Sequence, residues 1–569
     1  SLGIGQGYNT FTMLQLASAT ATLASGGLQF KPRVVTATQA SVNDTTALRA
    51  PSVPVKETGR VFPRLLHYMR DTPAGLHILF SKLDISDGFW CLIVQEADCF
   101  NFAYVLPQAE GEPCRIVVPA AVQMGWVESP SLFCTVTETA RDLTQHFVDN
   151  NIELPMDPLE DSMDIENVPK RARMSSPTRL LHVYVDDFCY AATQSDDGAH
   201  IPLIRRAAIH GIHAVFPPTS ITNHEGGKEP ISAKKLAAGD GNFNTKKDMI
   251  GFSFDRVKQT VQLPLEKAKA YIAETHTMLR RKTVPLRKHQ MLVGKPRHAA
   301  IILPAAKGFF TPLNDVMRGS PKIIGLGLHT EVQQALLDLI SLLRLLSSRP
   351  THVRELVPDM PMYAGYHDAA AKGAGGVWFS LVDDTSPVVW REVFPADIAA
   401  EVVSEDTLHG RLTNSDLELA AEVLAVGIAL DRITNTKHVP LGTLCDNTPT
   451  VSWIDKMASK SKSPTVGRLL RGLAFMLYCA HAGRLTMVHV PGVDNVMADI
   501  ASRPSKAQKL FRADSPLSDL EFCSSFDTTF PLPDNQAWSL ATVPHWLRFN
   551  VFETLRGKQL DLLHWTGGN

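Results

Sequence analysis

Residues 181–190 read Leu181-His182-Val183-Tyr184-Val185-Asp186-Asp187-Phe188-Cys189-Tyr190. The apolar and aromatic residues on either side favour short β-strands, whereas a pair of aspartates does not. Adjacent carboxylates repel each other, and a divalent cation is the usual reason for a protein to hold them together. The stretch predicts a β-hairpin with Asp186 and Asp187 at its tip, which either binds metal or is simply a solvated turn.

Composition limits the classes of protein that need to be considered. The chain has 569 residues, 44% of them hydrophobic and 20% charged, which is typical of globular protein and of roughly three to four domains. Its 8 cysteines form no CxxC pair, so we expect reduced thiols and an intracellular setting, cytoplasmic or nuclear. We expect no membrane partner, because no apolar run approaches ~20 residues. The net charge of −2 means that any nucleic-acid-binding surface must be local.

Two further patterns precede the hairpin in the chain. Residues 81–105 predict a strand that ends at Asp84, a turn that contains Phe89, and a second strand. Residues 119–135 predict a turn at Gly125 followed by a helix that begins at a Ser-Pro pair. The order is therefore carboxylate strand, glycine turn with helix, and Asp-Asp hairpin.

These three patterns, in this order, resemble the polymerase boxes of retroelement reverse transcriptases, and three ordered matches make coincidence unlikely. The resemblance implies that Asp84, Asp186 and Asp187 hold two Mg²⁺ (or Mn²⁺) ions. Such a metal pair supports in-line displacement at the α-phosphate of a dNTP, because it stabilises both the attacking and the leaving oxygen.

The same resemblance assigns residues to the nucleotide and to the primer–template. Phe89 would pack under the sugar and exclude a 2′-hydroxyl, although core packing is the competing interpretation of this residue. Gly125 would allow the backbone to approach the nucleotide closely, and Arg33 stands roughly where the fingers supply an arginine to the triphosphate. Tyr184 and Gly251 would contact nucleic acid, the latter in a short hairpin at the primer end.

A basic stretch follows. No Asp or Glu occurs from Thr275 to Asn314, which is unusual for an ordinary solvated face. We therefore interpret this region as a thumb-like helical segment that lies against a duplex backbone. The residues predicted to contact nucleic acid there are Arg280, Arg281, Arg287 and Lys288.

Residues 362–504 carry a second set of acids at the ends of predicted strands and helices. The set, which resembles that of retroelement ribonuclease H, is Asp368, Glu418, Asp446 and Asp499. The resemblance implies two more Mg²⁺ ions and hydrolysis by an activated water. Glu422 is a rival to Glu418, and a helix-dipole role is the alternative for Glu418 itself. The histidine that many members of this family carry before the last aspartate is missing, and His489 does not match it.

Residues 1–36 look foreign to the rest of the chain. They resemble the C-terminal end of the transpeptidase domain of class B penicillin-binding proteins. The Ser-x-x-Lys and Ser-x-Asn boxes of that family lie upstream of this segment and are absent here, so we expect no transpeptidation. A fusion, a gene-model artefact and an ordinary N-terminal helix all stay open.

Together these patterns predict a multidomain α+β and α/β protein with polymerase palm, fingers and thumb followed by a ribonuclease H-like α/β domain. The expected parts are 1–36 penicillin-binding-protein-like, 37–270 truncated fingers and palm, 271–361 thumb and connection, 362–504 ribonuclease H-like, and 505–569 tail. The predicted activity is RNA-directed DNA synthesis with removal of the RNA strand, so the partners are an RNA template, a DNA primer and an RNA–DNA hybrid. The alternative is a catalytically inactive nucleic-acid-binding remnant, because the fingers look truncated, or a chimeric gene model.

Overall fold

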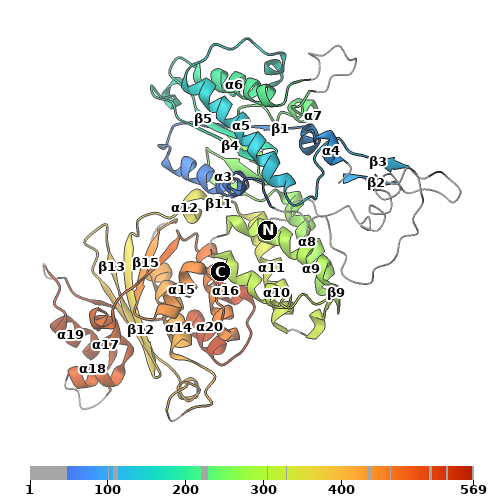
Figure 1. Ribbon diagram of the computed structural model, residues 1–569. Helices are drawn as coiled ribbons and strands as arrows, with labels where there is room; N and C mark the ends of the chain where they lie inside the picture. Colours follow the sequence, from blue (N-terminus) through green and yellow to red (C-terminus); the bar gives the residue numbers. More distant parts are fainter. Residues whose placement is uncertain are drawn as a thin grey trace. The chain divides into compact units, whose positions relative to one another are not determined.

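The computed structural model describes residues 48–99, 102–106, 113, 115–218, 229–303, 305–328, 330–405, 407–433, 437–461, 463–511, 516–533 and 536–566. Arg33 and the whole segment 1–36 lie outside the described residues. The chain divides between Gln259 and Thr260 into two compact units (Figure 1). The sequence predicts a boundary after residue 270 instead, and it separates the thumb-like and nuclease-like parts that the second unit combines.

The first unit is built on a three-stranded antiparallel sheet in the order β1-β5-β4. Side chains alternate across a strand, and Phe188, Tyr190 and Ala192 of β5 all belong to one buried apolar cluster. The helices α5 and α6 pack against each other and contribute to the same cluster (Figure 1). The elements of this framework are β1 (Ile78–Asp84), α5 (Ser129–Asp149), β4 (Arg179–Tyr184), β5 (Asp187–Thr193) and α6 (His200–Val215).

Shorter elements complete the first unit. They are α3 (Ser52–Asp71), η1 (Gly88–Cys91), α4 (Glu96–Cys99), β2 (Tyr104–Val105), β3 (Ile116–Val117), η3 (Pro158–Ser162), η4 (Lys170–Ala172), α7 (Ala233–Ala237), β6 (Lys246–Met249) and β7 (Phe252–Asp255). The predicted hairpin around Gly251 is present, with Met249 opposite Phe252. Its two turn residues, Ile250 and Gly251, both have positive φ, as tight two-residue hairpins of type I′ require.

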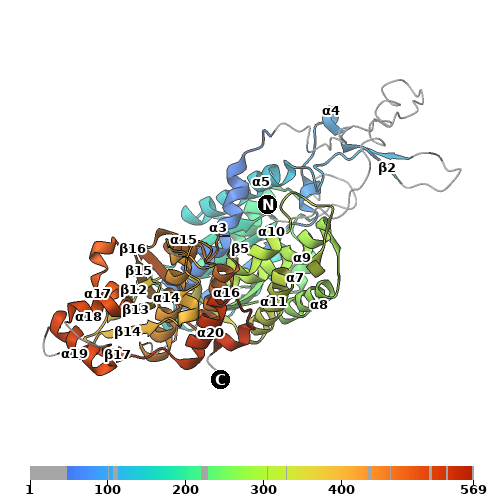
Figure 2. The same cartoon turned by 90° about the horizontal axis from the view of Figure 1, so that it is seen from below.

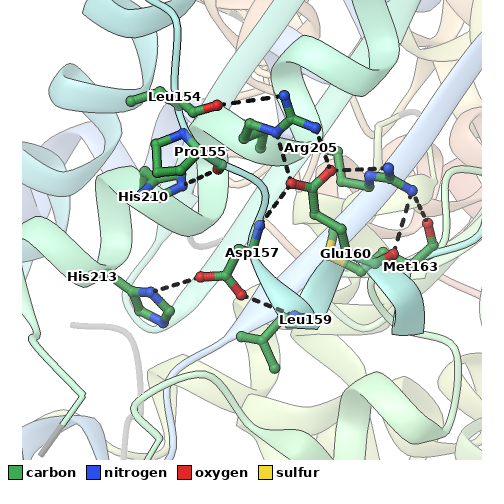
Figure 3. Close-up of polar contacts among 10 residues, drawn as sticks. Leu154, Pro155, Asp157, Leu159, Glu160, Met163, Arg205, His210 and His213 are labelled. Atoms are coloured by element: carbon green, nitrogen blue, oxygen red, sulfur yellow. Dashed lines mark hydrogen bonds and ion pairs between the residues drawn. The ribbon is translucent and has the colours of Figure 1, made fainter. Parts of the chain in front are cut away.

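The Pro-rich, mostly acidic segment from Asn150 to Pro177, which separates α5 from β4, is anchored to α6. Asp157 caps η3, and Glu160, which is 2% exposed, accepts hydrogen bonds from Arg205 at 3.0 Å and Arg206 at 2.8 Å (Figure 3). The buried Glu160 carboxylate is thus paired with two arginines of α6, and these ion pairs hold the loop against the helix.

The second unit begins with helices that pack on one another. Here α8 packs against both α9 and α11, and the short strands β8 and β11 pair antiparallel. The elements are β8 (Thr260–Gln262), α8 (Leu265–Leu279), β9 (Val284–Pro285), α9 (Leu286–Ala299), α10 (Thr311–Asp315), β10 (Ile323–Ile324), α11 (Thr330–Ser348), β11 (Thr351–His352) and α12 (Val353–Leu356).

A six-stranded mixed sheet in the order β16-β15-β12-β13-β14-β17 forms the rest of this unit. The strands β12, β13 and β14 are antiparallel neighbours, whereas β15 runs parallel to both β12 and β16. Helices cover both faces (Figures 1 and 2): Trp378 Nε1 donates to the Ala425 carbonyl of α14, while the adjacent Val377 clusters with Ile500 and Ala501 of α17. None of the helices in the described ranges is long and apolar enough to span a membrane.

The bounds in this part are β12 (Tyr363–Ala370), β13 (Gly373–Ser380), β14 (Val388–Val393), α13 (Ala396–Ala399), α14 (Asn414–Ile428), β15 (Leu441–Cys445), α15 (Thr448–Lys456), α16 (Pro464–Cys479), β16 (Leu485–His489), α17 (Val496–Ser502), α18 (Pro504–Leu510), α19 (Asp519–Thr529), β17 (Ser539–Ala541) and α20 (His545–Leu555).

The segment after residue 504, predicted to be a tail, is part of this sheet domain. Its strand β17 runs parallel to β14, and its helix α20 packs on α14 and α16. A Cβ added at Gly472 of α16 would lie 2.5 Å from the Trp565 ring, so the glycine permits this close approach. The fold of the second unit therefore needs the C-terminal residues.

Two contacts with α16 join α11 and the residues after it to the sheet domain within the second unit. Arg471 of α16 lies 3.0 Å from Asp338 of α11, and both side chains are almost fully buried. Arg349, which follows α11, lies against Glu355 and stacks 4.0 Å from the Tyr478 ring centroid. Because Asp338 and Arg471 are far apart in the sequence, no local pattern reveals that they form an ion pair.

Candidate active sites

The first candidate site lies at one end of the β1-β5-β4 sheet. Asp84 is the last residue of β1 and is paired with Asp187, the first residue of β5. Asp186 lies in the two-residue turn between β4 and β5, and its carbonyl accepts a hydrogen bond from Ile85 N at 3.4 Å. The structure therefore brings all three predicted carboxylate residues to one end of the sheet, although about a hundred residues separate Asp84 from the other two.

Two lysines enter this site. Lys82 Nζ lies 3.1 Å from Asp84 Oδ2 and 3.0 Å from Asp240 Oδ2, and Lys235 Nζ contacts Asp84 Oδ1. Burial opposes ionisation of Asp84, yet hydrogen bonds from Asp187 and Lys235 and the charge of Lys82 lower the pKa of this carboxyl. Burial and the neighbouring Asp84 carboxylate raise the pKa of Asp187 to about 8. The arrangement concentrates negative charge on Asp84 and keeps a proton between it and Asp187.

The hairpin turn is held in an unusual conformation. Val185 has a φ of 61°, a region in which β-branched residues are rarely found, and its side chain is 4% exposed in the core. Asp186, next to it, is exposed. The apolar anchor thus directs the neighbouring carboxylate outward, at a cost in backbone strain of roughly 1–3 kcal/mol.

The other residues predicted for this site lie around it in different settings. Phe89 in η1 is buried, with its ring centroid 4.6 Å from that of Phe133, so it does pack in the core. Gly125 has a φ of 103°, which explains the glycine by backbone conformation rather than by crowding. Tyr184 is half-buried opposite Asp187.

The predicted basic residues of the second unit are all exposed. We call Arg280, Arg281, Arg287 and Lys288 the α8–α9 basic cluster, because they lie at the facing ends of these two helices. A cavity of about 360 Å³ between the helices is lined by Met278 and Met291 as well as by Arg281 and Lys288. The acidic Glu274 also lines this cavity, beside the cations Arg281, Lys288 and Lys295.

The second candidate site lies where β12, β15 and α14 meet. Tyr366 of β12 is opposite Leu444 of the parallel strand β15, so Asp368 and Asp446, each two residues later, leave the same edge of the sheet. Glu418 reaches them from the second turn of α14. One carboxylate oxygen from each residue lies within 4.8 Å of the other two, which is close enough for a shared cation.

The electrostatics of this trio favour a positively charged occupant. Burial, followed by the charges of Asp368 and Asp446, raises the pKa of Glu418 well above its usual value. Burial also raises the pKa of Asp368, although a hydrogen bond from Ser502 and the nearby Arg503 oppose this effect. Burial and mutual repulsion thus oppose ionisation of Glu418 and Asp368, and a divalent cation bound beside them would offset this effect.

Asp499 is held apart from the other three acids. It is half-buried on α17, 3.1 Å from Arg503 and in contact with Lys506, and it does not belong to the group within 4.8 Å. Glu422, the rival of Glu418, is fully buried and accepts a hydrogen bond from Thr443 at 2.9 Å. Of the two glutamates, the structure brings Glu418 to Asp368 and Asp446.

Sequence reasoning set His489 aside, but the structure places it beside the trio. Its Nε2 lies 3.2 Å from the carbonyl oxygen of Asp446, at the exposed end of β16. Since β16 and β15 are parallel neighbours, their carboxyl ends share an edge, and this could have identified the histidine. The sequence also did not identify Arg503, Lys506 and Lys82, because a cation that pairs with an acid can lie at any distance from it in the sequence.

No protein-family model matches this chain, and no curated protein matches it. Among solved structures, it is similar to the foamy viral protease–reverse transcriptase in complex with an RNA/DNA hybrid. The identity is 15% and the TM-score 0.32, over 72% of this chain and 44% of that chain. The same viral protein with double-stranded DNA matches at 15% identity and a TM-score of 0.31, over 72% of this chain and 67% of that one.

Ribonuclease H1 from the halophilic archaeon Halobacterium salinarum NRC-1 is also similar. It matches at 19% identity and a TM-score of 0.19, over 26% of this chain and 98% of that chain. The present chain thus spans less than half the length of the first viral protein. Identities and TM-scores this low do not decide chemistry, which depends on the side chains of the two sites.

Proposed function

We propose that this chain is an RNA-directed DNA polymerase with ribonuclease H activity, of the kind that retrotransposable elements use. The observation that carries the proposal is the convergence of Asp368, Glu418 and Asp446. These residues come from three separate elements, yet their carboxylate oxygens lie within 4.8 Å of one another. The mixed sheet with helices on both faces supports the ribonuclease H-like fold proposed for residues 362–504.

The donor set of this site fits Mg²⁺ or Mn²⁺. All three ligands are hard carboxylate oxygens, and the trio is buried or half-buried, so ionised acids need a cation to offset their repulsion. When bound, a metal pair would activate water and stabilise the leaving oxygen of the RNA strand. Ser502 Oγ donates to Asp368 Oδ2 and fixes that carboxylate, while Arg503 lies between Asp368 and Asp499.

The first site supports DNA synthesis by the same reasoning. Asp84 Oδ2 is buried 3.1 Å from the Lys82 ammonium, so a metal ion would have to displace this lysine to bind the carboxylate. Asp84, Asp186 and Asp187 would hold two ions and the triphosphate of a dNTP. The α8–α9 basic cluster would bind the backbone of the primer–template.

A second candidate function is nucleic-acid binding without synthesis. The observation that favours it is the pairing of Lys82 and Lys235 with Asp84, because both ammonium groups compete with metal for that carboxylate. The two candidate functions predict different results in a primer-extension assay: a polymerase extends the primer, and a binding protein does not.

The test uses the full chain with Mg²⁺, a labelled RNA–DNA hybrid and a primed RNA template. Asp446→Asn should abolish hybrid cleavage and leave extension, and Asp186→Asn should do the reverse, since each removes one anionic ligand from one site. Asp494→Asn, which changes an exposed acid outside the trio, is the matched control. If Asp446→Asn cleaves the hybrid as well as the control does, the nuclease assignment is wrong. Binding of the primed template without extension would select the second candidate.

A further inference from the structure

A second polar cluster lies directly behind the nuclease-like trio, on the α14 side of the sheet. Its three residues are each one position, or one helical turn, away from a carboxylate of that trio in the sequence. His367 precedes Asp368 in β12, Cys445 precedes Asp446 at the end of β15, and Glu422 follows Glu418 by one turn of α14. Because successive strand residues face opposite sides, His367 and Asp368 serve different clusters.

Two of these residues, His367 and Cys445, form a candidate ligand set with Glu418 of the trio. Ligand atoms of His367, Glu418 and Cys445 all lie within 4.8 Å of one another, and the three residues are between 0% and 1% exposed. Cys445 Sγ lies 3.7 Å from Glu418 Oε2. A nitrogen, an oxygen and a sulfur donor thus converge in a space that solvent does not reach.

The polar atoms of this cluster are incompletely satisfied. Within the described part of the chain, neither ring nitrogen of His367 has a hydrogen-bond partner, and neither does Glu422 Oε2. His367 Nδ1 is 3.2 Å from Glu422 Oε2, but their geometry is not that of a hydrogen bond. Because unpaired polar groups in the interior destabilise a fold, the cluster is poorly explained as ordinary core.

We propose that His367, Glu418 and Cys445 form a binding site for a borderline-soft divalent cation of the Zn²⁺ class. Zn²⁺ is held by imidazole nitrogen, thiolate sulfur and carboxylate oxygen, whereas Mg²⁺ takes oxygen alone. With metal–ligand distances of about 2.0–2.3 Å, tetrahedral ligands lie about 3.3–3.7 Å apart. Cys445 Sγ and Glu418 Oε2, 3.7 Å apart, already have this spacing, and the other separations, all within 4.8 Å, need to shorten by no more than about 1.5 Å.

The surroundings of the three ligands are those that a metal site requires. Glu422 lies beside His367 and is itself fixed by a hydrogen bond from Thr443 Oγ1 at 2.9 Å, so it can accept a hydrogen bond from one imidazole N–H while the other ring nitrogen binds metal. Asn447 N–H donates to Cys445 Sγ at 3.3 Å, which stabilises a thiolate. Binding releases the protons of the Cys445 thiol and of the Glu418 carboxyl group, and the resulting thiolate and carboxylate together neutralise the ion.

Glu418 belongs to both donor sets, so the two sites would prefer different cations. A hard cation such as Mg²⁺ would bind Glu418 together with Asp368 and Asp446, and a softer one such as Zn²⁺ would bind it together with His367 and Cys445. Oxygen donors lie on the side of Asp368 and Asp446, and nitrogen and sulfur donors lie on the side of His367 and Cys445. A Zn²⁺-class ion behind the sheet would therefore compete with Mg²⁺ for Glu418.

The experiment uses the metal-free full chain and Co²⁺ as a spectroscopic probe. One equivalent should produce visible absorption bands of bound Co²⁺ together with a thiolate-to-cobalt charge-transfer band, and Zn²⁺ should abolish both. Cys445→Ser should lose the charge-transfer band, whereas Cys523→Ser, which changes a half-buried cysteine outside the cluster, should keep it. Glu422→Gln should keep the band but weaken Co²⁺ binding about 10- to 100-fold.

A folded wild-type chain without the charge-transfer band would overturn the proposal, as would a band that survives in Cys445→Ser. If Cys445→Ser fails to fold, the wild-type spectrum and the affinity of Glu422→Gln still decide the question. The absorption reports metal binding rather than RNA cleavage, so this test is independent of whether the proposed nuclease activity is found.

Discussion

Two glutamates one turn apart on α14 allow a sharply matched experiment on the nuclease-like site. Glu418 and Glu422 are both fully buried, and glutamine replaces either one with almost no change in shape. Only Glu418 lies with Asp368 and Asp446. Glu418→Gln removes one anionic metal ligand, which we expect to cost about 4 kcal/mol of transition-state stabilisation and thus about a thousandfold in hybrid cleavage. Glu422→Gln should leave cleavage within a few-fold of wild type.

We expect Glu422 to affect instead the way in which the free energy of unfolding depends on pH. Burial raises its pKa from 4.5 to about 8, with the Thr443 hydrogen bond opposing this shift. Between these values the unfolded chain releases the proton and the folded chain retains it, so stability falls as the pH rises from 4.5 to about 8. At about 1.4 kcal/mol per pKa unit, the loss reaches about 3 kcal/mol near pH 7.

The assay is thermal melting of the metal-free wild type and Glu422→Gln at pH 5 and pH 7.5, alongside hybrid cleavage. Because glutamine carries no titrating proton, the variant should gain stability relative to wild type at the higher pH and differ little at the lower. The reasoning is refuted if Glu422→Gln abolishes cleavage while Glu418→Gln retains it. Parallel melting curves at both pH values would refute the account of the buried carboxyl.

Three other changes test features outside that helix. Replacing the whole α8–α9 basic cluster by alanine should reduce the log–log salt slope of primer–template binding by about one unit or less per lost phosphate contact, and an unchanged slope would remove the thumb assignment. Glu160→Ala leaves Arg205 and Arg206 without their shared carboxylate, so we expect a loss of about 2–3 kcal/mol in urea unfolding and faster proteolysis after Asn150; equal proteolysis rates would contradict the anchoring. Gly472→Ala should destabilise by about 1–3 kcal/mol because of the Trp565 ring, whereas an ordinary helical glycine would gain about 1 kcal/mol from the same change, so the sign measured by tryptophan-monitored melting is diagnostic.

Local sequence was sufficient to locate the strand ends that carry acids. Asp84, Asp187 and Asp446 lie at or next to strand ends, as the apolar runs beside them predict, whereas Asp368 lies within β12, two residues before its last residue. The pairing of Asp84 with Asp187 follows from antiparallel neighbours, which a hairpin-rich region favours.

What sequence could not supply was the choice among acids and the position of cations. Asp499 looked equivalent to Asp446, yet the turn of α17 places it against Arg503 and Lys506. Lys82 lies two residues before Asp84 and so shares its face of the strand, but only the register with β5 reveals that it also approaches Asp187. These relations depend on tertiary contacts between residues far apart in the chain.

The parallel pairing of β17 with β14 has a practical consequence for anyone who wishes to isolate the sheet domain. A fragment that stops at residue 504 would leave Val388, Val389 and Trp390 without their pairing partners in β17. It would also lack Phe522, Phe526 and Trp538, which pack in one cluster with the buried Val389. A bare, apolar edge of this kind recruits strands from other molecules. Such a fragment should aggregate, and a soluble domain should extend through Trp565.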